Sequence, residues 1–477
     1  MIIISLIFPL IFTLSACKKR VKVATKYEII AEYAPETATL AGTAKITFEN
    51  CGDGEISILK FQLYPNAYRK DALLKPVSKT YQGIAYYAGE SYGEMVISSV
   101  NGAKSWEVMG EDENILQVHL IESLFPEDKI VLDVGFLVKL AKVEHRTGVA
   151  KNTVNLGHCF PMLCGIKNGG FYECAYYDVG DPFFSECADF KMTLTLPKEY
   201  MPVSTGQIVS ERALERKTQY VLSATAVRDF AIVLSTRFKK AETNVDGTEI
   251  SYYYYQDEQP IETLSTATQA FAYYEKTFGD YPYPQFTLAQ AGLCVDAVEY
   301  PCLSLLSDRL ETDKKPLVIA RETARQWWYA VVGNNQLEHA WQGESLAEYS
   351  AVCFMEEYEK YGFSREKLIT DAHKEYRLYY DVYGSVLGRT DTSMTRHLKH
   401  YKGEYEYECL TKKKGLVMFD MLRKSVGDKK FFAGLKKYYK NAQFTVATPE
   451  TLIGAFEKTG LDVRGFFDSF LNGKAIL

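Results

Sequence analysis

The chain has 477 residues, more than a single hydrophobic core usually organises, so two or three domains are expected. Hydrophobic residues make up 47% and charged residues 24%, which is ordinary for a soluble globular protein. The net charge of -6 argues against a nucleic-acid-binding protein, because such proteins usually present a basic face.

The N-terminal segment predicts a membrane anchor. Residues 2–14 are apolar apart from Ser5 and Thr13, and a Leu-Ser-Ala-Cys run follows that ends at Cys17. The stretch is short for a bilayer span and has the length of a signal-peptide core. The run resembles the lipobox of bacterial lipoproteins, which implies a signal peptide over 1–16 and a lipidated Cys17.

An uncleaved N-terminal anchor is the alternative, since no Lys or Arg precedes the apolar run. Both interpretations place the protein on the extracytoplasmic face of a bacterial cell membrane. The rest of the chain is not expected to cross the membrane, because no later segment approaches 18 consecutive apolar residues.

The first half of the chain has the pattern of β-strands. Apolar and polar residues alternate over 44–49 and 191–196, which predicts strands with one buried face. Short apolar runs with β-branched residues at 130–140 and 230–234 predict further strands. We therefore expect an anchor and linker over 17–26 and a β domain over 27–238.

The second half changes to a helical period. Apolar positions recur at helical spacing over 261–278, and a Gly-Asp-Tyr-Pro breaker cluster ends this segment. Further helices are predicted at 316–332, 343–360, 365–380, 414–425 and 449–458. Residues 239–477 are therefore expected to form a mainly helical domain.

The cysteines give no sign of a metal ribbon or a redox motif. Without Cys17 nine remain, an odd number, and the sequence contains no Cys-x-x-Cys pair. Most lie in apolar surroundings and are predicted to be small buried residues. Examples are Cys187, Cys294, Cys302 and Cys353.

Three segments in the second half carry a family resemblance. Residues 295–301 read Val-Asp-Ala-Val-Glu-Tyr-Pro, residues 321–329 read Arg-Glu-Thr-Ala-Arg-Gln-Trp-Trp-Tyr, and residues 341–349 read Trp-Gln-Gly-Glu-Ser-Leu-Ala-Glu-Tyr. Together they resemble the aminopeptidase N family of gluzincin zinc metallopeptidases. That family has a Gly-x-Met-Glu-Asn/Tyr motif, then HExxH with Gln-Trp-Trp/Phe, then a further glutamate.

The resemblance extends over nearly the whole mature chain. Residues 63–67, 180–186 and 227–231 look like the family's N-terminal domain, and residues 278–284 look like the start of its thermolysin-like domain. The resemblance implies an α+β multidomain fold. An antiparallel, saddle-like β domain would precede a mainly helical metallopeptidase domain.

The residues that would bind zinc in this family are replaced. HExxH places two histidines on one helix face, where they bind zinc with a glutamate from the next helix, and the glutamate within the motif is the general base. Here both histidine positions are arginines, Arg321 and Arg325, which have no lone pair for a metal. Glu322 at the base position and Glu344 at the third-ligand position remain. The family would use one zinc ion, but no cofactor is predicted for this chain.

Two further family positions bear on activity. The family's oxyanion-stabilising tyrosine stands two residues before a Lys-Gly pair, and Lys412 occupies that position here. Glu299 matches the glutamate that holds a substrate's amino terminus, and a structural carboxylate paired with a cation is the alternative role. The two arginines are predicted to pair with Glu322 and Glu344, since bare buried carboxylates would cost several kcal/mol.

Histidines elsewhere do not restore a ligand triad. His397 and His400 stand three residues apart in a basic stretch that predicts a solvated helix face, since adjacent cations oppose metal binding. His339 precedes the predicted third-ligand helix, but one histidine is not enough for a zinc site.

The sequence leaves three functional interpretations. The favoured one is a non-catalytic, membrane-anchored lipoprotein that binds peptides or a protein partner. The first alternative is an active zinc-dependent aminopeptidase with a non-standard site. The second is a structural subunit whose cleft is filled by ion pairs. Because a fold does not determine a function, the choice among these interpretations depends on the residues of the site.

Overall fold

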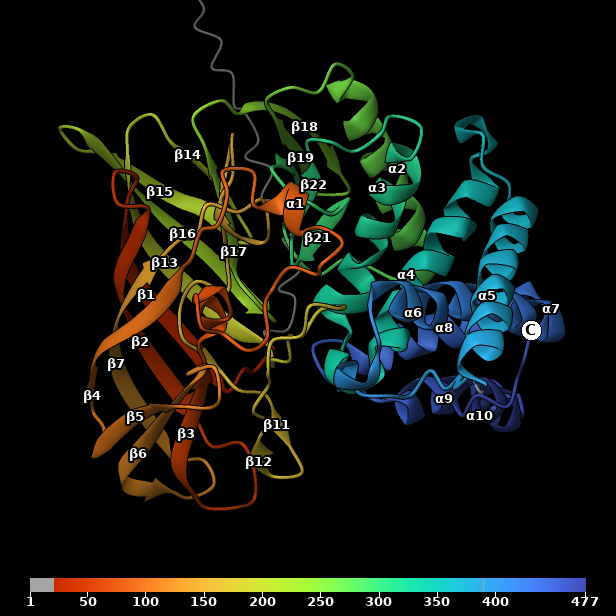
Figure 1. Ribbon diagram of the computed structural model, residues 1–477, viewed down its shortest axis with the longest axis horizontal. Helices are drawn as coiled ribbons and strands as arrows, with labels where there is room; N and C mark the ends of the chain where they lie inside the picture. Colours follow the sequence, from red (N-terminus) through yellow and green to blue (C-terminus); the bar gives the residue numbers. More distant parts are fainter. Residues whose placement is uncertain (1–20, 389) are drawn as a thin grey trace, which may run out of the picture.

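The computed structural model describes residues 21–388 and 390–477, and the predicted signal peptide and Cys17 lie outside these residues. In Figure 1 the β-rich half of the chain lies on the left and the helical half on the right. This agrees with the α+β fold predicted from the two kinds of periodicity. None of the helices in the described ranges combines the length and hydropathy needed to cross a bilayer.

The largest layer of the β domain is a seven-stranded sheet. Its strands, in spatial order, are β15 (Gln207–Ala213), β16 (Lys217–Val227), β13 (Ala188–Pro197), β1 (Thr25–Ala34), β2 (Thr39–Glu49), β7 (Lys129–Lys139) and β4 (Glu94–Asn101). Strand β1 pairs antiparallel with β2 and parallel with β13. Tyr27, Ile29 and Ala31 of β1 alternate with exposed residues, so one face of the sheet covers the core.

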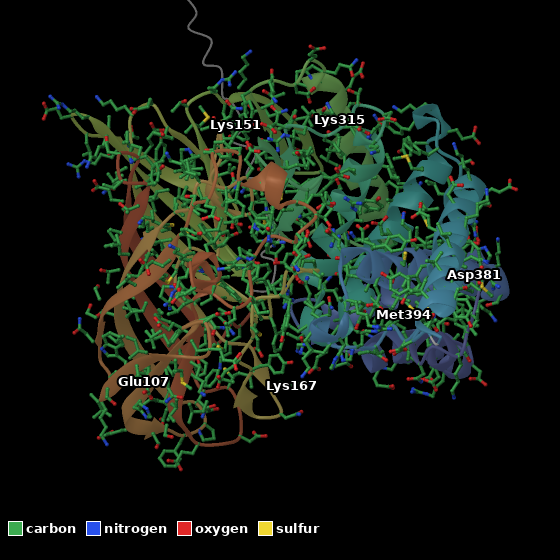
Figure 2. All side chains as sticks on the ribbon, in the orientation of Figure 1. Glu107, Lys151, Lys167, Lys315, Asp381 and Met394 are labelled. Atoms are coloured by element: carbon green, nitrogen blue, oxygen red, sulfur yellow. The ribbon has the colours of Figure 1, made fainter. Side chains whose placement is uncertain are left out.

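Smaller sheets complete this domain. One contains β10 (Met162–Leu163), β3 (Ile56–Gln62), β6 (Ile115–Leu124) and β5 (Ser105–Met109). Another contains β14 (Met201–Ser204), β17 (Ala231–Ser235), β9 (Val154–Gly157) and β8 (Thr147–Val149). The hairpin of β11 (Ile166–Lys167) and β12 (Gly170–Phe171) and the short helix α1 (Gln82–Ala85) reach toward the helical half. Figure 2 labels Lys167 on this hairpin, where its ammonium pairs with Glu338 of the helical half.

The helical half begins with a five-stranded sheet. It contains β18 (Lys239–Val245), β19 (Thr248–Tyr254), β20 (Gln285–Ala291), β22 (Leu303–Ser307) and β21 (Ala297–Tyr300), with β21 as an antiparallel edge strand. The helices are α2 (Pro260–Phe278), α3 (Lys315–Ala324), α4 (Gln336–Glu357), α5 (Arg365–Leu387), α6 (Glu404–Glu408), α7 (Lys414–Val426), α8 (Asp428–Ala442), α9 (Pro449–Glu457) and α10 (Arg464–Leu471). Short strands β23 (Gly333–Asn334) and β24 (Val446–Ala447) pair in parallel.

The helix predicted over 316–332 is interrupted. Helix α3 ends at Ala324, and a π-helical turn follows over Gln326–Val331. Two bulky neighbours explain the wider turn, because each indole is buried and donates to a different partner. Trp327 donates to the Gly279 carbonyl at 2.9 Å, and Trp328 donates to the Ser350 hydroxyl at 2.8 Å. Such turns are common at functional sites.

Other helix boundaries also differ from the predictions. Helix α4 starts seven residues before position 343, with a first turn that the Asn335 side chain caps, and its backbone is kinked at His339 before the main part of the helix. Helix α5 continues to Leu387, and α8 and α10 were not predicted. Cys187, Cys294, Cys302 and Cys353 are buried, as predicted.

A buried arginine joins the two halves. Arg228, which follows β16, is 3% exposed and donates to carbonyl groups of the helical half. Its Nε lies 3.0 Å from the Tyr329 oxygen, and its Nη2 lies 2.9 Å from the Thr445 oxygen. Gly333 lies against this guanidinium, where an added Cβ would be 2.1 Å from its central carbon.

Candidate functional site

Helices α3 and α4 present the candidate site residues to one another. Arg321 and Glu322 lie in the last turn of α3, and Arg325 is the residue that caps its C-terminal end. Glu344 and Glu348 lie one turn apart on α4. Because residues four apart share one helix face, both arginines point at the glutamates of α4.

Arg325 is at the centre of this site. Its Nη1 donates to Glu344 Oε1 at 2.9 Å, and its Nη2 donates to Glu344 Oε2 at 2.8 Å. The same Nη1 donates to Glu299 Oε1 on β21 at 2.9 Å. Its Nε lies 3.5 Å from Glu322 Oε1. A bidentate guanidinium–carboxylate pair of this kind is among the stronger polar contacts in proteins.

Arg321 makes a second set of ion pairs. Its Nε donates to Glu322 Oε1 at 3.0 Å, and its Nη1 donates to Glu348 Oε1 at 3.2 Å. The predicted pairing of the two arginines with Glu322 and Glu344 is therefore present. Glu348 was missed in the sequence, although its position four residues after Glu344 on one helix indicates the shared face.

Lys412 lies next to these ion pairs. It belongs to a π-helical turn, Cys409–Lys413, between α6 and α7. Its Nζ lies 3.9 Å from Glu344 Oε2 and 3.0 Å from Glu408 Oε1. The ammonium therefore adds a third cation where the family resemblance implies a tyrosine hydroxyl.

The surroundings shift the acidity of the two central carboxylates in opposite directions. Burial acts to raise the pKa of Glu344, but Arg325 and Lys412 outweigh it and lower that pKa to about 2. Burial raises the pKa of Glu299 well above its usual value, and the carboxylate of Asp181 adds to this effect although Arg325 opposes it. Glu344 is therefore the permanent anion that balances Arg325.

The residues present do not fit a zinc ion. Zinc sites in proteins are built from thiolate, imidazole and carboxylate ligands, and the two arginine positions supply none of them. Within the described ranges, the one group of three metal-capable side chains is Asp181, Glu299 and Glu344, with ligand atoms within 4.8 Å of one another. The Arg325 guanidinium already contacts two of these carboxylates, and Asp181 pairs with Arg146.

The histidines do not join this group. His339 lies beside Glu338 and Lys167, and burial lowers its pKa. The predicted solvent exposure holds for His400, but the predicted helix is only a three-residue 3-10 turn, and His397 is half-buried. His397 precedes this turn and accepts from the Lys399 amide through Nδ1, so it caps the turn.

Glu299 lies in the site but faces inward. It is 7% exposed, and its carboxylate contacts Arg325. The neighbouring Tyr300 is fully buried, and its hydroxyl packs against Gly157 of the β domain. The cation that the sequence left open as an alternative partner for Glu299 is therefore Arg325.

Asp181, Arg146 and Glu408 were also missed. Glu408 stands four residues before Lys412, so helical spacing could have indicated that pair. Asp181 and Arg146 come from the β domain, and no local pattern connects them with the helices.

Comparison with known proteins identifies the fold. Residues 262–470 match the family described as Peptidase family M1 domain. An M1 zinc metallopeptidase from Deinococcus radiodurans has a similar structure, with a TM-score of 0.65 and 15% identity over 96% of this chain and 96% of that chain. A mutant of an M1 zinc metallopeptidase from the same organism, bound to a Tyr-Ser-Ala substrate, gives 0.63 and 14% over 95% and 96%. No curated protein sequence matches the chain. The prediction of a metallopeptidase domain of this family in the second half of the chain is confirmed, as is the two-domain fold.

Proposed function

We propose that this chain, which carries a peptidase family M1 domain, is a non-catalytic, lipid-anchored protein that binds peptides or a protein partner outside a bacterial cell membrane. The observation that supports this most directly is the Arg325 guanidinium between Glu299 and Glu344. A peptidase of this family would hold a metal ion at such a position. In this chain the side chains of Arg321, Arg325 and Lys412 supply positive charge to the carboxylates of the site instead.

Electrostatics oppose metal binding at this position. With an effective dielectric near 20, a dication about 4 Å from one arginine is repelled by on the order of 8 kcal/mol. This repulsion adds to the lost imidazole ligands. Displacing the guanidinium would also break its bidentate bond with Glu344. We therefore propose that the cleft binds no zinc and hydrolyses no peptide.

The burial of the ion pairs favours a second candidate function. Glu299, Glu344 and Arg325 are each at most 7% exposed, so the carboxylate that would hold a substrate's amino terminus is already satisfied. A structural subunit whose cleft is filled by its own ion pairs would have this arrangement. If the protein does bind peptides, they would contact the surface around the site and not the buried Glu299 carboxylate.

Metal analysis with an aminoacyl-substrate assay tests the non-catalytic proposal. The unmodified protein should contain no stoichiometric zinc and release no product. Arg321→His alone should restore neither property, because Arg325 remains. The double variant Arg321→His with Arg325→His should recover zinc binding, and turnover should require Lys412→Tyr in addition. Stoichiometric zinc in the unmodified protein, with activity lost in Glu322→Gln, would establish the active aminopeptidase instead.

A binding assay separates the two non-catalytic candidates. A short peptide and its N-acetylated form are titrated into the unmodified protein and into Glu299→Ala. Peptide recognition through the amino terminus predicts a preference for the free peptide that Glu299→Ala removes. Equal affinities in all four combinations would favour the structural subunit.

A further inference from the structure

The described chain begins at Val21 in the groove where the two halves meet. Val21 and Val23 pack with Phe444 and Ala226 in one apolar cluster. Beside them lies a groove of about 610 Å³. It is lined by β15 and β16 of the β domain and by two segments of the helical half, one before β20 and one after α8. Val21, Val209, Gln285, Cys302, Gln443 and Phe444 are among its lining residues.

The distance from this groove to the proposed lipid anchor is short. Three residues lie between Cys17 and Val21, and the four steps from one Cα atom to the next extend at most about 14 Å. A globular chain of this length has a radius of gyration of about 23 Å. Because the tether is shorter than this radius, an anchor at Cys17 would hold one particular face of the molecule near the bilayer.

The chemistry of the groove face fits a membrane surface. Strand β15 exposes Ile208 and Val209, which are 46% and 58% accessible. Lys22, Lys26 and Lys129 surround the second depression beside Val21, where Glu49 pairs with two of them. The tether itself reads Lys-Lys-Arg over 18–20. Exposed aliphatic side chains flanked by cations are the pattern that binds anionic lipid surfaces.

The outer rim of the candidate site consists of Tyr81, Asp296, Glu404 and Glu408. It lies at the other end of the five-stranded sheet. Gln285 at the start of β20 lines the groove, whereas Cys294, just past the end of β20, packs with the side chain of Tyr81. Seven strand residues span about 20 Å between these ends. Asp296 lies at the far end too, since its carbonyl accepts from the Ser307 amide at the end of β22.

Lys412 and Glu408 connect this rim with the buried ion pairs. Ser78 of the β domain donates to Glu404, at 3.3 Å, on the helix that also carries Glu408. We propose that the groove face around Val21 lies against the membrane and that the rim of Tyr81, Asp296, Glu404 and Glu408 faces the aqueous side. This orientation rests on the proposed anchor at Cys17. It would admit partners to the site from solution.

Site-specific fluorescence quenching tests the orientation. The lipidated full-length protein is placed in vesicles of phosphatidylglycerol and phosphatidylcholine that carry a nitroxide headgroup lipid. Cys51 is the exposed cysteine of the described chain, so Cys51→Ser gives a background for labelling. Single reporters are introduced as Gln207→Cys and Gln443→Cys on the groove face. Asp296→Cys and Glu408→Cys provide matched reporters on the rim.

Both groove-face reporters should lose most of their fluorescence on adding the nitroxide lipid, and both rim reporters should keep theirs. Equal quenching at all four positions, or stronger quenching at the rim, would overturn the orientation. Vesicle sedimentation is measured first. Protein that stays in the supernatant would refute the anchor itself, and the orientation with it, whereas sedimented protein with the wrong quenching pattern refutes the orientation alone.

Discussion

Replacing Arg325 by methionine tests whether the ion-pair network holds the helical domain together. Methionine keeps much of the side-chain length and removes the cation. Glu344 and Glu299 would then be buried without their partner. Breaking a buried ion pair by removing one member costs about 3–5 kcal/mol, because the remaining charge is left uncompensated. We expect Arg325→Met to lower the free energy of unfolding at pH 7 by this amount.

The pH dependence provides a second signature. The pKa of Glu344 falls from 4.5 to about 2 in the folded protein. A carboxylate with a lowered folded pKa stabilises the fold above its unfolded pKa, and this stabilisation is lost as the pH falls through the folded pKa. The shift corresponds to about 3 kcal/mol. The difference between the unmodified protein and Arg325→Met should therefore shrink as the pH falls from 4.5 toward 2.

Urea unfolding followed by tryptophan fluorescence measures both effects. Trp327, Trp328 and Trp341 are fully buried around the site and report on this domain. Arg377→Met is the matched control, since that arginine forms an exposed pair with Asp381 and should change stability by less than about 1 kcal/mol. Equal losses in the two variants, or a loss for Arg325→Met that does not depend on pH, would refute the reasoning.

Three further predictions follow from single positions. Cys17→Ser should move the protein from the membrane fraction to the soluble fraction, and unchanged fractionation would favour an uncleaved apolar anchor. Gly415→Ala should destabilise the fold by about 1–3 kcal/mol, because the added Cβ would lie 1.9 Å from the Ser345 hydroxyl oxygen; Gly454→Ala on α9 meets nothing within 4 Å and should not destabilise. Burial lowers the pKa of Lys414 from 10.5 to about 8, so the unfolded chain binds more protons between these pH values. The unmodified protein should therefore gain about 3 kcal/mol relative to Lys414→Met from pH 8 to 10.5 in urea titrations, and parallel pH profiles would contradict this.

Local periodicity was sufficient to predict most of the elements. Alternation predicted β2 and β13, short apolar runs with β-branched residues predicted β7 and β17, and helical spacing predicted α2, α7 and α9. Helix α8 was missed although its buried Phe431, Leu435 and Tyr438 recur at helical spacing. The π-helical turn after α3 was not predictable in this way, because the packing of two adjacent indoles against different elements decides it.

The contacts of the site also fall into two groups, those that local spacing predicts and those that only tertiary packing sets. The spacing between Arg325 and Glu344 places them on consecutive helices, so their pairing could be predicted from the sequence. The contact between Glu299 and Arg325 depends on the position of β21 beside α3, which only tertiary packing sets. The approach of Asp181 crosses from one domain to the other, and no periodicity contains that information.

The contacts of Arg228 make the β domain part of the scaffold for the site. Its guanidinium donates to two backbone oxygens within the π-helical turn, those of Tyr329 and Val331, and to that of Thr445 beside the short parallel pair of β23 and β24. A fragment of the chain that began after β17 would lack Arg228. These carbonyl groups would lose their donor, and the space beside Gly333 that the guanidinium fills would be exposed. The shape of the turn that directs Arg325 is therefore set partly by a residue about a hundred positions earlier in the chain.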